Sequence, residues 1–188
     1  MAITTTPRKM TADEFFALGD ELPPVTQLID GALVMSTPSL RHQRVVAWLI
    51  YRFMSFAEAR PGVGEMCIEV STVIDEHNVY APDVWWMPEE RRLAGDERRL
   101  LTPPPLVAEV RSPSTWRYDV GTKLRHYEAA GVSEVWLIDT DAAVVLVFRR
   151  SSPEAASFDL SLELTTADDL STPLIPGWSV GLAELFAR

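Results

Sequence analysis

The chain has 188 residues, 47% of them hydrophobic and 23% charged, which is ordinary for one globular domain spanning residues 1–188 with a proper core. Its formal net charge of −10 argues against a broad basic surface for nonspecific nucleic-acid binding. Cys67 is the only cysteine, which excludes an intrachain disulfide and a cysteine-rich zinc site and favours a reducing compartment, the cytoplasm.

Two short elements are predicted near the N-terminus. The first ten residues lack the apolar segment that a secretory signal requires. Thr11 and Glu14 have the spacing of a capping box and precede apolar residues, so a short helix is expected to begin there. Asp30 and Gly31 separate two apolar runs, and this dipeptide favours the tight turn of a β-hairpin.

A long amphipathic helix is predicted next. Ser39 can cap this helix, which is expected to run to about Arg60, with apolar residues at helical spacing from 45 to 56. Arg52 interrupts the apolar stripe, so the segment is too short and too charged to cross a membrane. His42 lies beside the stripe, where it could be a hydrogen-bonded, partly buried residue or part of a site.

The middle of the chain is predicted to form strands. Residues 65–75 and 79–87 are strand-like segments joined by a polar turn, and residues 106–111 form a third strand. Trp85 and Trp86 are adjacent in one strand and must point to opposite faces. One of the two is therefore expected to be exposed and available for a contact between subunits.

Two carboxylates interrupt these apolar strands. Asp83 follows Pro82, which withholds a ladder donor and favours a bent or edge position; the side chain could reach a cleft or simply face solvent. Glu109 shares a sheet face with Arg111, so an ion pair between them is the alternative to a functional role. Burying a carboxylate is costly unless it is paired or binds a metal, and a divalent cation would keep both ionised.

A helix is expected from residue 119 to 130, ending at Gly131. Asp119, Lys123 and Tyr127 are spaced at i, i+4 and i+8 and therefore share one face of this helix. The alternative is structural, with Asp119 as the N-cap and the other two residues as neighbours on the surface.

The remaining elements complete an α/β or α+β pattern. Short strands are expected at 135–138 and 143–148, an alternating edge strand at 158–164, and a last short helix at about 181–186. The core order is helix, three strands, helix, strand, which predicts a sheet packed by helices.

This set of residues has the composition that phosphodiester hydrolysis requires. Asp83 and Glu109 could hold Mg²⁺ or Mn²⁺, which lowers the pKa of a bound water, and Lys123 could orient that water or offset phosphoryl charge. Residues 89–125 contain eight basic and six acidic side chains, so this segment is either a local basic lip or a solvated loop.

Several segments resemble the Uma-two-type family of restriction endonuclease-like proteins, a branch of the PD-(D/E)XK nuclease superfamily. They are STPSLRHQRVV, YAPDVWWM, LVAEVRSPST and YDVGTKLRHYEAAGVSEVWLID, and the similarity runs from about residue 27 to 148. The resemblance implies an αβββαβ core with a mixed central sheet flanked by helices, an N-terminal hairpin and extra C-terminal strands. It also implies a metal-dependent endonuclease acting on DNA, and cleavage of both strands implies a homodimer.

The resemblance assigns roles to individual positions. Asp83 matches the acidic residue of the PD element, Glu109 the acid of the next strand, and Lys123 a lysine that this branch carries on the following helix. His42 and Tyr127 match a histidine of the long helix and a tyrosine one turn after the lysine, and both are expected to support the site.

Two positions depart from the family pattern. Gln27 stands where a glutamate is usual, so a third acid is missing, and Arg111 occupies the place of the strand lysine of the superfamily. An arginine remains protonated and cannot act as a base, but it could bind phosphate together with Arg117 and Arg125, the other candidate substrate-binding residues. The departures leave three readings open: an active nuclease, a catalytically silent binding module of the same fold, and a domain whose acids only form ion pairs.

Overall fold

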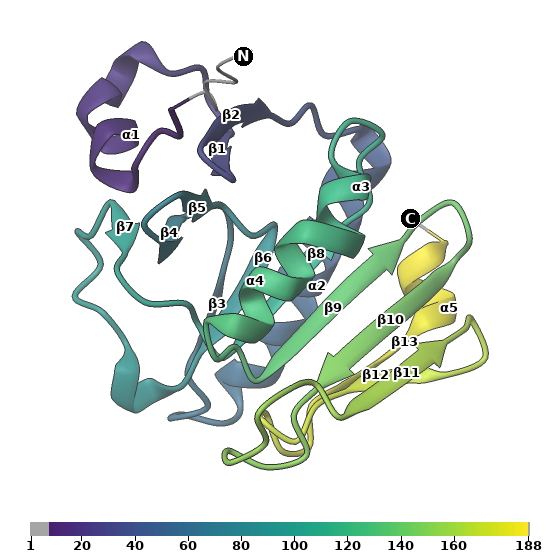
Figure 1. The fold of residues 1–188 in the computed structure, drawn as a ribbon. Coiled ribbons are helices and arrows are strands. Elements are labelled where there is room, and N and C mark those ends of the chain that lie inside the picture. The colour runs from purple at the N-terminus through teal and green to yellow at the C-terminus, as the bar shows by residue number, and fades with distance from the viewer. Residues whose placement is uncertain (1–7, 188) are drawn as a thin grey trace.

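The computed structural model describes residues 8–187, so most of the segment that argued against a secretory signal lies outside the described residues. A five-stranded sheet from the N-terminal half lies beside a six-stranded sheet that continues into the C-terminal half (Figure 1). The mixed sheets flanked by helices confirm the predicted fold class. Within residues 8–187, none of the helices combines the length and apolarity needed to cross a membrane.

The N-terminal predictions are confirmed. Helix α1 (Ala12–Leu18) begins with the capping box of Thr11 and Glu14 and is followed by the 3₁₀ turn η1 (Gly19–Glu21). Strands β1 (Thr26–Ile29) and β2 (Ala32–Met35) form the antiparallel hairpin. Asp30 and Gly31 both have positive φ angles, of 51° and 77°, which the tight turn requires.

The long helix is also where the sequence places it. Helix α2 (Leu40–Glu58) begins after Ser39, whose hydroxyl accepts a hydrogen bond from the backbone N–H of His42. The apolar stripe of α2 packs on one face of the six-stranded sheet, where Val45, Leu49 and Phe53 are buried.

The two strand segments predicted at 65–75 and 79–87 are each divided between the two sheets. The first consists of β3 (Glu65–Cys67) and β4 (Ser71–Asp75), and the second of β5 (Asn78–Tyr80) and β6 (Val84–Met87). Strands β4 and β5 join the five-stranded sheet, whereas β3 and β6 join the six-stranded sheet. The prediction of two continuous strands was therefore wrong, because an apolar pattern with period two does not report which sheet a residue joins.

The strands change sheets beside Pro82. The backbone N–H of Glu69 donates to the carbonyl of Pro82 at 3.1 Å, and Glu69 has a φ of 47°. Pro82 has no N–H to donate to a neighbouring strand, so strand pairing is also interrupted between β5 and β6. Asp83 is consequently placed at the bend, immediately before β6.

The sheet orders are β2-β1-β5-β4-β7 and β11-β10-β9-β8-β6-β3. In the six-stranded sheet the β8–β9 pair is parallel and the others are antiparallel. Strand β11 is an edge strand, as predicted. The further bounds are β7 (Arg99–Leu100), β8 (Leu106–Val110), β9 (Glu134–Asp139), β10 (Val144–Arg149) and β11 (Leu160–Leu164), with the 3₁₀ turn η2 (Glu89–Arg91) before β7.

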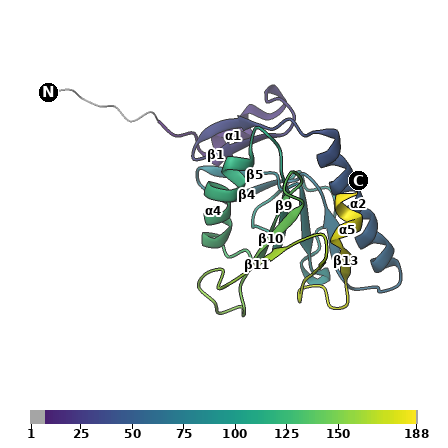
Figure 2. The same cartoon turned by 90° about the vertical axis from the view of Figure 1, so that its right-hand side faces the viewer.

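Helices cover both faces of the six-stranded sheet, as Figure 2 shows. Helices α2 and α5 (Leu182–Phe186) lie on one side, and α4 (Leu124–Ala129) lies on the other. Trp86 packs in the core on the α2 side and Trp85 in the core on the α4 side, as their alternation predicts. The expectation of an exposed tryptophan was wrong: Trp85 is 3% and Trp86 5% exposed, because both faces of the sheet are covered.

A fully buried glutamate connects the C-terminal hairpin to the main sheet. Strands β12 (Asp169–Ser171) and β13 (Ser179–Gly181) form a separate two-stranded sheet. The carboxylate of Glu134 accepts hydrogen bonds from Trp136 Nε1 at 2.6 Å, Arg149 Nε at 2.7 Å and Thr172 Oγ1 at 2.7 Å. A buried carboxylate with several donors holds two elements in one arrangement.

Replacing Glu134 by alanine is expected to lower the free energy of unfolding by about 3–5 kcal/mol, because Arg149 and two neutral donors lose their buried acceptor. Urea denaturation followed by circular dichroism measures this loss. Glu163→Ala on the exposed edge strand β11 is the matched control and should change stability by less than about 0.5 kcal/mol. If Glu134→Ala lowered the free energy of unfolding no more than the control, Glu134 would not be what holds the C-terminal hairpin to the main sheet.

Candidate active site

Pairing between β6 and β8 brings the two strand carboxylates together. Val84 pairs with Ala108 in antiparallel register, so Asp83, one residue earlier, faces Glu109, one residue later. Side chains directly opposite one another in such a pair have Cβ atoms about 5 Å apart. The backbone N–H of Val110 donates to Asp83 Oδ2 at 2.7 Å and fixes this carboxylate against β8.

His42 holds the same carboxylate from the other direction. Its Nε2 lies 3.0 Å from Asp83 Oδ2, and its side chain is 2% exposed. Its other ring nitrogen, Nδ1, is buried and has no hydrogen-bond partner among residues 8–187. His42 is therefore a buried residue in polar contact with Asp83, and its part in a site stays a prediction.

Lys123 is the centre of the arrangement. Its Nζ lies 2.6 Å from Glu109 Oε1 and 2.9 Å from Asp119 Oδ1, and its side chain is 1% exposed. The hydroxyl of Tyr127 donates to the same Glu109 oxygen at 2.5 Å. The structure therefore gathers Glu109, Asp119, Lys123 and Tyr127 in one buried ion cluster, with Asp83 beside it.

The helix that carries these residues has a π turn. Helix α3 (Trp116–Tyr118) is followed by the π-helical turn η3 (Asp119–Lys123), which continues into α4. The expected helix is thus present, but the π turn was not predicted; such turns frequently occur at functional sites. The structural alternative for these residues was wrong, since Asp119 does not cap the helix and Asp119, Lys123 and Tyr127 are buried.

Asp119 belongs to the cluster, although the sequence analysis did not count it among the candidate site residues. Its Oδ2 accepts a hydrogen bond from Thr115 Oγ1 at 3.4 Å, and Thr115 Oγ1 lies 2.6 Å from Ser112 Oγ. The i, i+4 spacing of Asp119 and Lys123 was the signal that could have identified it.

Burial and charge shift the pKa values of the cluster. Burial raises the pKa of Glu109 to about 8, against the opposing effect of Lys123. Burial also raises the pKa of Asp119, and Lys123 again acts in the opposite direction. Burial lowers the pKa of Lys123, but Asp119 and Glu109 outweigh this effect and leave its pKa above the usual value. The ammonium of Lys123 thus lies between two carboxyl groups, those of Glu109 and Asp119, with Asp83 beside the pair.

Tyr127 acts as a neutral donor in this cluster. Burial and the nearby Glu109 carboxylate raise the pKa of its phenol well above the usual value. Its hydroxyl therefore retains its proton and keeps donating to Glu109. The second supporting tyrosine is Tyr80, whose ring centroid lies 5.4 Å from Lys123 Nζ.

The three candidate arginines lie outside the cluster. Arg111 Nη1 is 2.8 Å from Asp139 Oδ2 and its Nε is 3.0 Å from Asp141 Oδ2, so the alternative of an ion pair with Glu109 was wrong. The guanidinium groups of Arg117 and Arg125 are exposed and donate to neighbours on their own helical segment, Tyr118 and Thr122.

Gln27 takes a structural position next to the site. The amide side chain of this residue is buried, and its Oε1 accepts a hydrogen bond from the backbone N–H of Ala81 at 3.4 Å. It supports the bend that precedes Asp83, in the place where the resemblance leads one to expect a third acid.

The donor set fits a cation that retains several waters. No group of three or more His, Cys, Asp or Glu side chains arranged for a metal ion occurs within residues 8–187. In that same part of the chain, Asp83 Oδ1 and Glu109 Oε2 accept no hydrogen bond, whereas their sister oxygens do. Mg²⁺ characteristically binds through one or two carboxylates and keeps water ligands, so these two oxygens match its needs.

Replacing Lys123 by methionine is expected to cost about 3–5 kcal/mol of folding free energy, because Glu109 and Asp119 lose their buried counter-charge. The pKa of Glu109 is about 8 beside Lys123 and rises further when the ammonium is removed, so the deficit should grow as the pH rises above about 8. Denaturant titrations at several pH values measure both effects. Lys9→Met is the matched control, since Lys9 is exposed and 3.9 Å from Asp30; a deficit no larger than that of the control would refute the ion cluster.

Comparisons with known proteins place this chain in a family. The chain resembles a crystal structure from Anabaena variabilis ATCC 29413, described as a "putative nuclease belonging to DUF820", with a TM-score of 0.77 and 19% sequence identity over 95% of this chain and 98% of that one. This likeness shows a shared fold. No curated protein matches the sequence significantly. The model of the Uma2 family, described as "Putative restriction endonuclease", matches residues 12–183, and the chain therefore belongs to the Uma2 family.

Proposed function

We propose that the chain is a metal-dependent endodeoxyribonuclease that hydrolyses phosphodiester bonds of DNA. The observation that carries the proposal is the convergence of Asp83, Glu109 and Lys123 from a strand bend, a second strand and a π-helical turn. A divalent cation at the free carboxylate oxygens would supply a water of lowered pKa and a Lewis acid for the phosphoryl oxygen. Membership of a nuclease family supports the class of reaction.

The protein's own residues then have distinct tasks. The ammonium of Lys123 offers fixed positive charge to the phosphoryl oxygens and can orient the attacking water. Tyr127 donates to Glu109 Oε1 and thereby leaves the second oxygen of Glu109 as the free ligand position. His42 and the Val110 N–H hold one oxygen of Asp83 in the same way. Positioning of this kind by neighbouring groups is how carboxylate ligands are oriented toward a metal.

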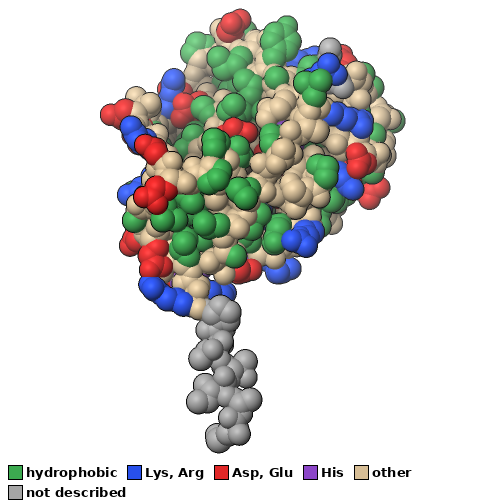
Figure 3. All heavy atoms as spheres, turned by 90° about the horizontal axis from the view of Figure 1, so that it is seen from above, with side chains coloured by type: hydrophobic (Ala, Val, Ile, Leu, Met, Phe, Trp, Pro, Cys, Tyr) green, Lys and Arg blue, Asp and Glu red, His purple; other side chains and the backbone are tan. Residues whose placement is uncertain are grey.

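Substrate contacts are assigned to the three arginines. Arg117 and Arg125 are exposed and have no carboxylate partner among residues 8–187, so they are free to bind phosphate. Arg111 is held by Asp139 and Asp141 and contributes a fixed guanidinium at the end of β8 that carries Glu109. Seen from above, basic and acidic side chains are interspersed (Figure 3), so binding is expected to depend on such individual contacts.

Cleavage of both strands requires two such sites, because one site cuts one strand. We extend the proposal to a homodimer acting in the cytoplasm, in keeping with the single cysteine. Light scattering on the purified protein determines the subunit number directly.

A catalytically silent nuclease-fold module is the second candidate function. The acidic pI of about 4.7, the amide at Gln27 and the engagement of Arg111 by two aspartates favour it. The two candidates differ in whether the carboxylates bind a divalent cation and whether DNA is cut.

Cleavage of supercoiled plasmid with Mg²⁺ or Mn²⁺ tests the nuclease proposal. Asp83→Asn and Glu109→Gln are each expected to lower the cleavage rate at least about 100-fold, because the divalent cation loses a charged ligand. Glu163→Gln, an equivalent change on the exposed edge strand, should cut at the wild-type rate. Equal rates in all four proteins, or no cleavage by the wild type, would rule out the assignment.

Titration calorimetry with Mn²⁺ in the absence of DNA separates the two candidates. The wild-type protein and Glu163→Gln are expected to bind Mn²⁺, and Glu109→Gln is expected to bind it about 10- to 100-fold more weakly. Binding that is unchanged in Glu109→Gln would show that this carboxylate holds no metal, as a silent module predicts.

A further inference from the structure

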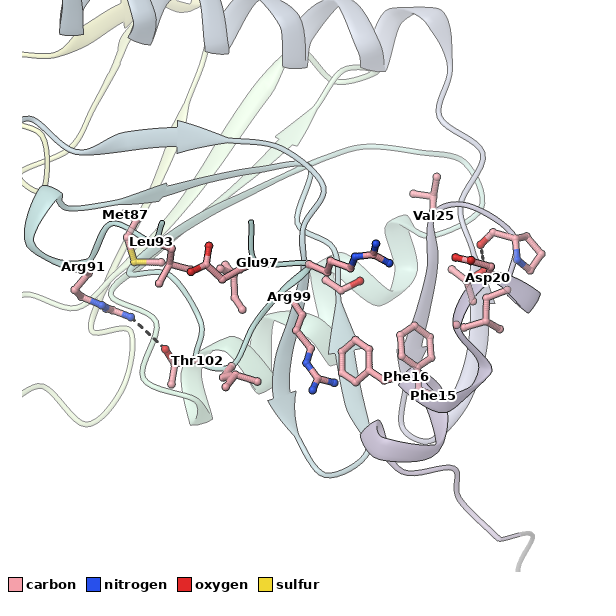
Figure 4. Close-up of a pocket in the computed structure, with 18 residues that line it drawn as sticks. Phe15, Phe16, Asp20, Val25, Met87, Arg91, Leu93, Glu97, Arg99 and Thr102 are labelled. Carbon is pink, nitrogen blue, oxygen red and sulfur yellow. Dashed lines mark hydrogen bonds between the residues drawn. The ribbon is translucent and has the colours of Figure 1, made fainter. Parts of the chain in front are cut away.

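A concave site lies away from the acidic cluster. Its volume is about 1010 Å³, and it opens between the α1–η1 segment and residues 87–102 (Figure 4). Neither Asp83, Glu109 nor Lys123 lines it. Sites for small organic groups typically measure about 300–1,000 Å³, so this pocket has room for a base together with its sugar and phosphate.

The wall of the pocket offers an aromatic stacking surface. Phe15 and Phe16 meet edge to face with ring centroids 5.3 Å apart, and the guanidinium of Arg99 lies 4.4 Å from the centroid of Phe16. Figure 4 shows Arg99, Phe16 and Phe15 grouped on one side of the pocket. Buried Met87 and Leu100 add apolar lining. Aromatic rings and guanidinium planes are the groups on which unpaired nucleobases stack.

The pocket lining carries an excess of positive charge, with three arginines against Asp20 and Glu97. Arg98 and Arg99 have no carboxylate within ion-pair distance among residues 8–187, in a chain whose net charge is −10. Glu97 lies between η2 and Arg98 in the sequence. Its two carboxylate oxygens accept hydrogen bonds from the backbone N–H groups of Ala94 and Gly95. Asp20 lies at the opposite end of the pocket from Arg91 (Figure 4). Two unpaired guanidinium groups beside aromatic rings fit an anionic, aromatic ligand.

One residue of the pocket wall, Met87, lies on the same face of the six-stranded sheet as the acidic cluster. Met87 packs with Trp85, Val107 and Tyr127, and Tyr127 donates to Glu109. Asp83 and Met87 are four residues apart along one strand, which corresponds to about 13 Å. The pocket wall at Met87 and the cluster are therefore separated by a distance that a few nucleotides can span.

We propose that this pocket binds an unstacked base of a single nucleic-acid strand, with the base on the Phe16–Arg99 surface and the adjoining phosphates on Arg98 and Arg99. The inference rests on the proposed function in that it takes the ligand to be part of the nuclease substrate. It adds a substrate class, since a base reaches such a pocket only from single-stranded or locally opened DNA.

Fluorescence anisotropy with a short labelled oligothymidylate tests the proposal in EDTA, where no cleavage occurs, and at one fixed low salt concentration. The Arg98→Ala/Arg99→Ala double variant and Phe16→Ala are each expected to weaken binding about tenfold or more, and so is replacing the bases by abasic sites. Arg60→Ala is the matched control: its guanidinium lies 4.3 Å from the ring of Phe56 outside the pocket, and its removal should leave binding unchanged.

Two outcomes would overturn the proposal. The first is equal affinity for the oligothymidylate and the abasic strand, or wild-type affinity in the pocket variants. The second is that laurate binds the wild-type protein tightly, fails to bind the double variant and does not displace the oligothymidylate. That result would assign the pocket to acyl anions. A protein that binds the strand through this pocket but cuts no plasmid would refute the nuclease function and leave the pocket assignment intact. A protein that cuts plasmid while its pocket variants bind normally would refute the pocket assignment alone.

Discussion

The buried ammonium of Lys123 is the interaction on which the candidate site depends. It contacts Glu109 and Asp119 at ion-pair distance in a place from which water is nearly excluded. Removing these charges from water costs several kcal/mol for each group, and their attraction only partly repays it. Four apolar side chains of similar size would pack here at no such cost. Stability alone therefore explains the cluster poorly, and this is the physical ground for proposing a chemical task.

The bend at Pro82 gives the cluster its second carboxylate. Because the chain changes from one sheet to the other at this proline, Asp83 emerges at the junction, where its carboxylate can meet both β8 and helix α2. In an uninterrupted strand Asp83 would be one more residue buried between layers. The bend thus places the Asp83 carboxylate where it accepts from the Val110 N–H and meets His42.

The acidic cluster and the arginine-rich pocket differ in the charge that they present. The cluster offers carboxylate oxygens suited to a cation, whereas the pocket carries unpaired guanidinium groups suited to phosphate. Under the proposed function, such separation would let a polyanion approach a protein of net charge −10 through a few defined contacts. This arrangement favours a ligand that is held in one register over nonspecific attraction to DNA.

The sequence alone determined the order of elements and most of the residues of the cluster. The capping box at Thr11, the Asp30-Gly31 turn and the stripe of α2 are local signals, and local signals suffice when a helix or turn is stabilised by its own neighbours. The spacing of Asp119, Lys123 and Tyr127 likewise showed that they share a helix face.

Tertiary structure decided the rest. Whether that helix face is buried, where Arg111 finds its partners, and at which residue a strand leaves one sheet for another all depend on contacts between residues far apart in the chain. The same holds for the pocket between α1 and β7, whose walls come from segments about 80 residues apart. Charge pairing inside a core is a property of the assembled layers, because only packing removes the water that would otherwise solvate each group.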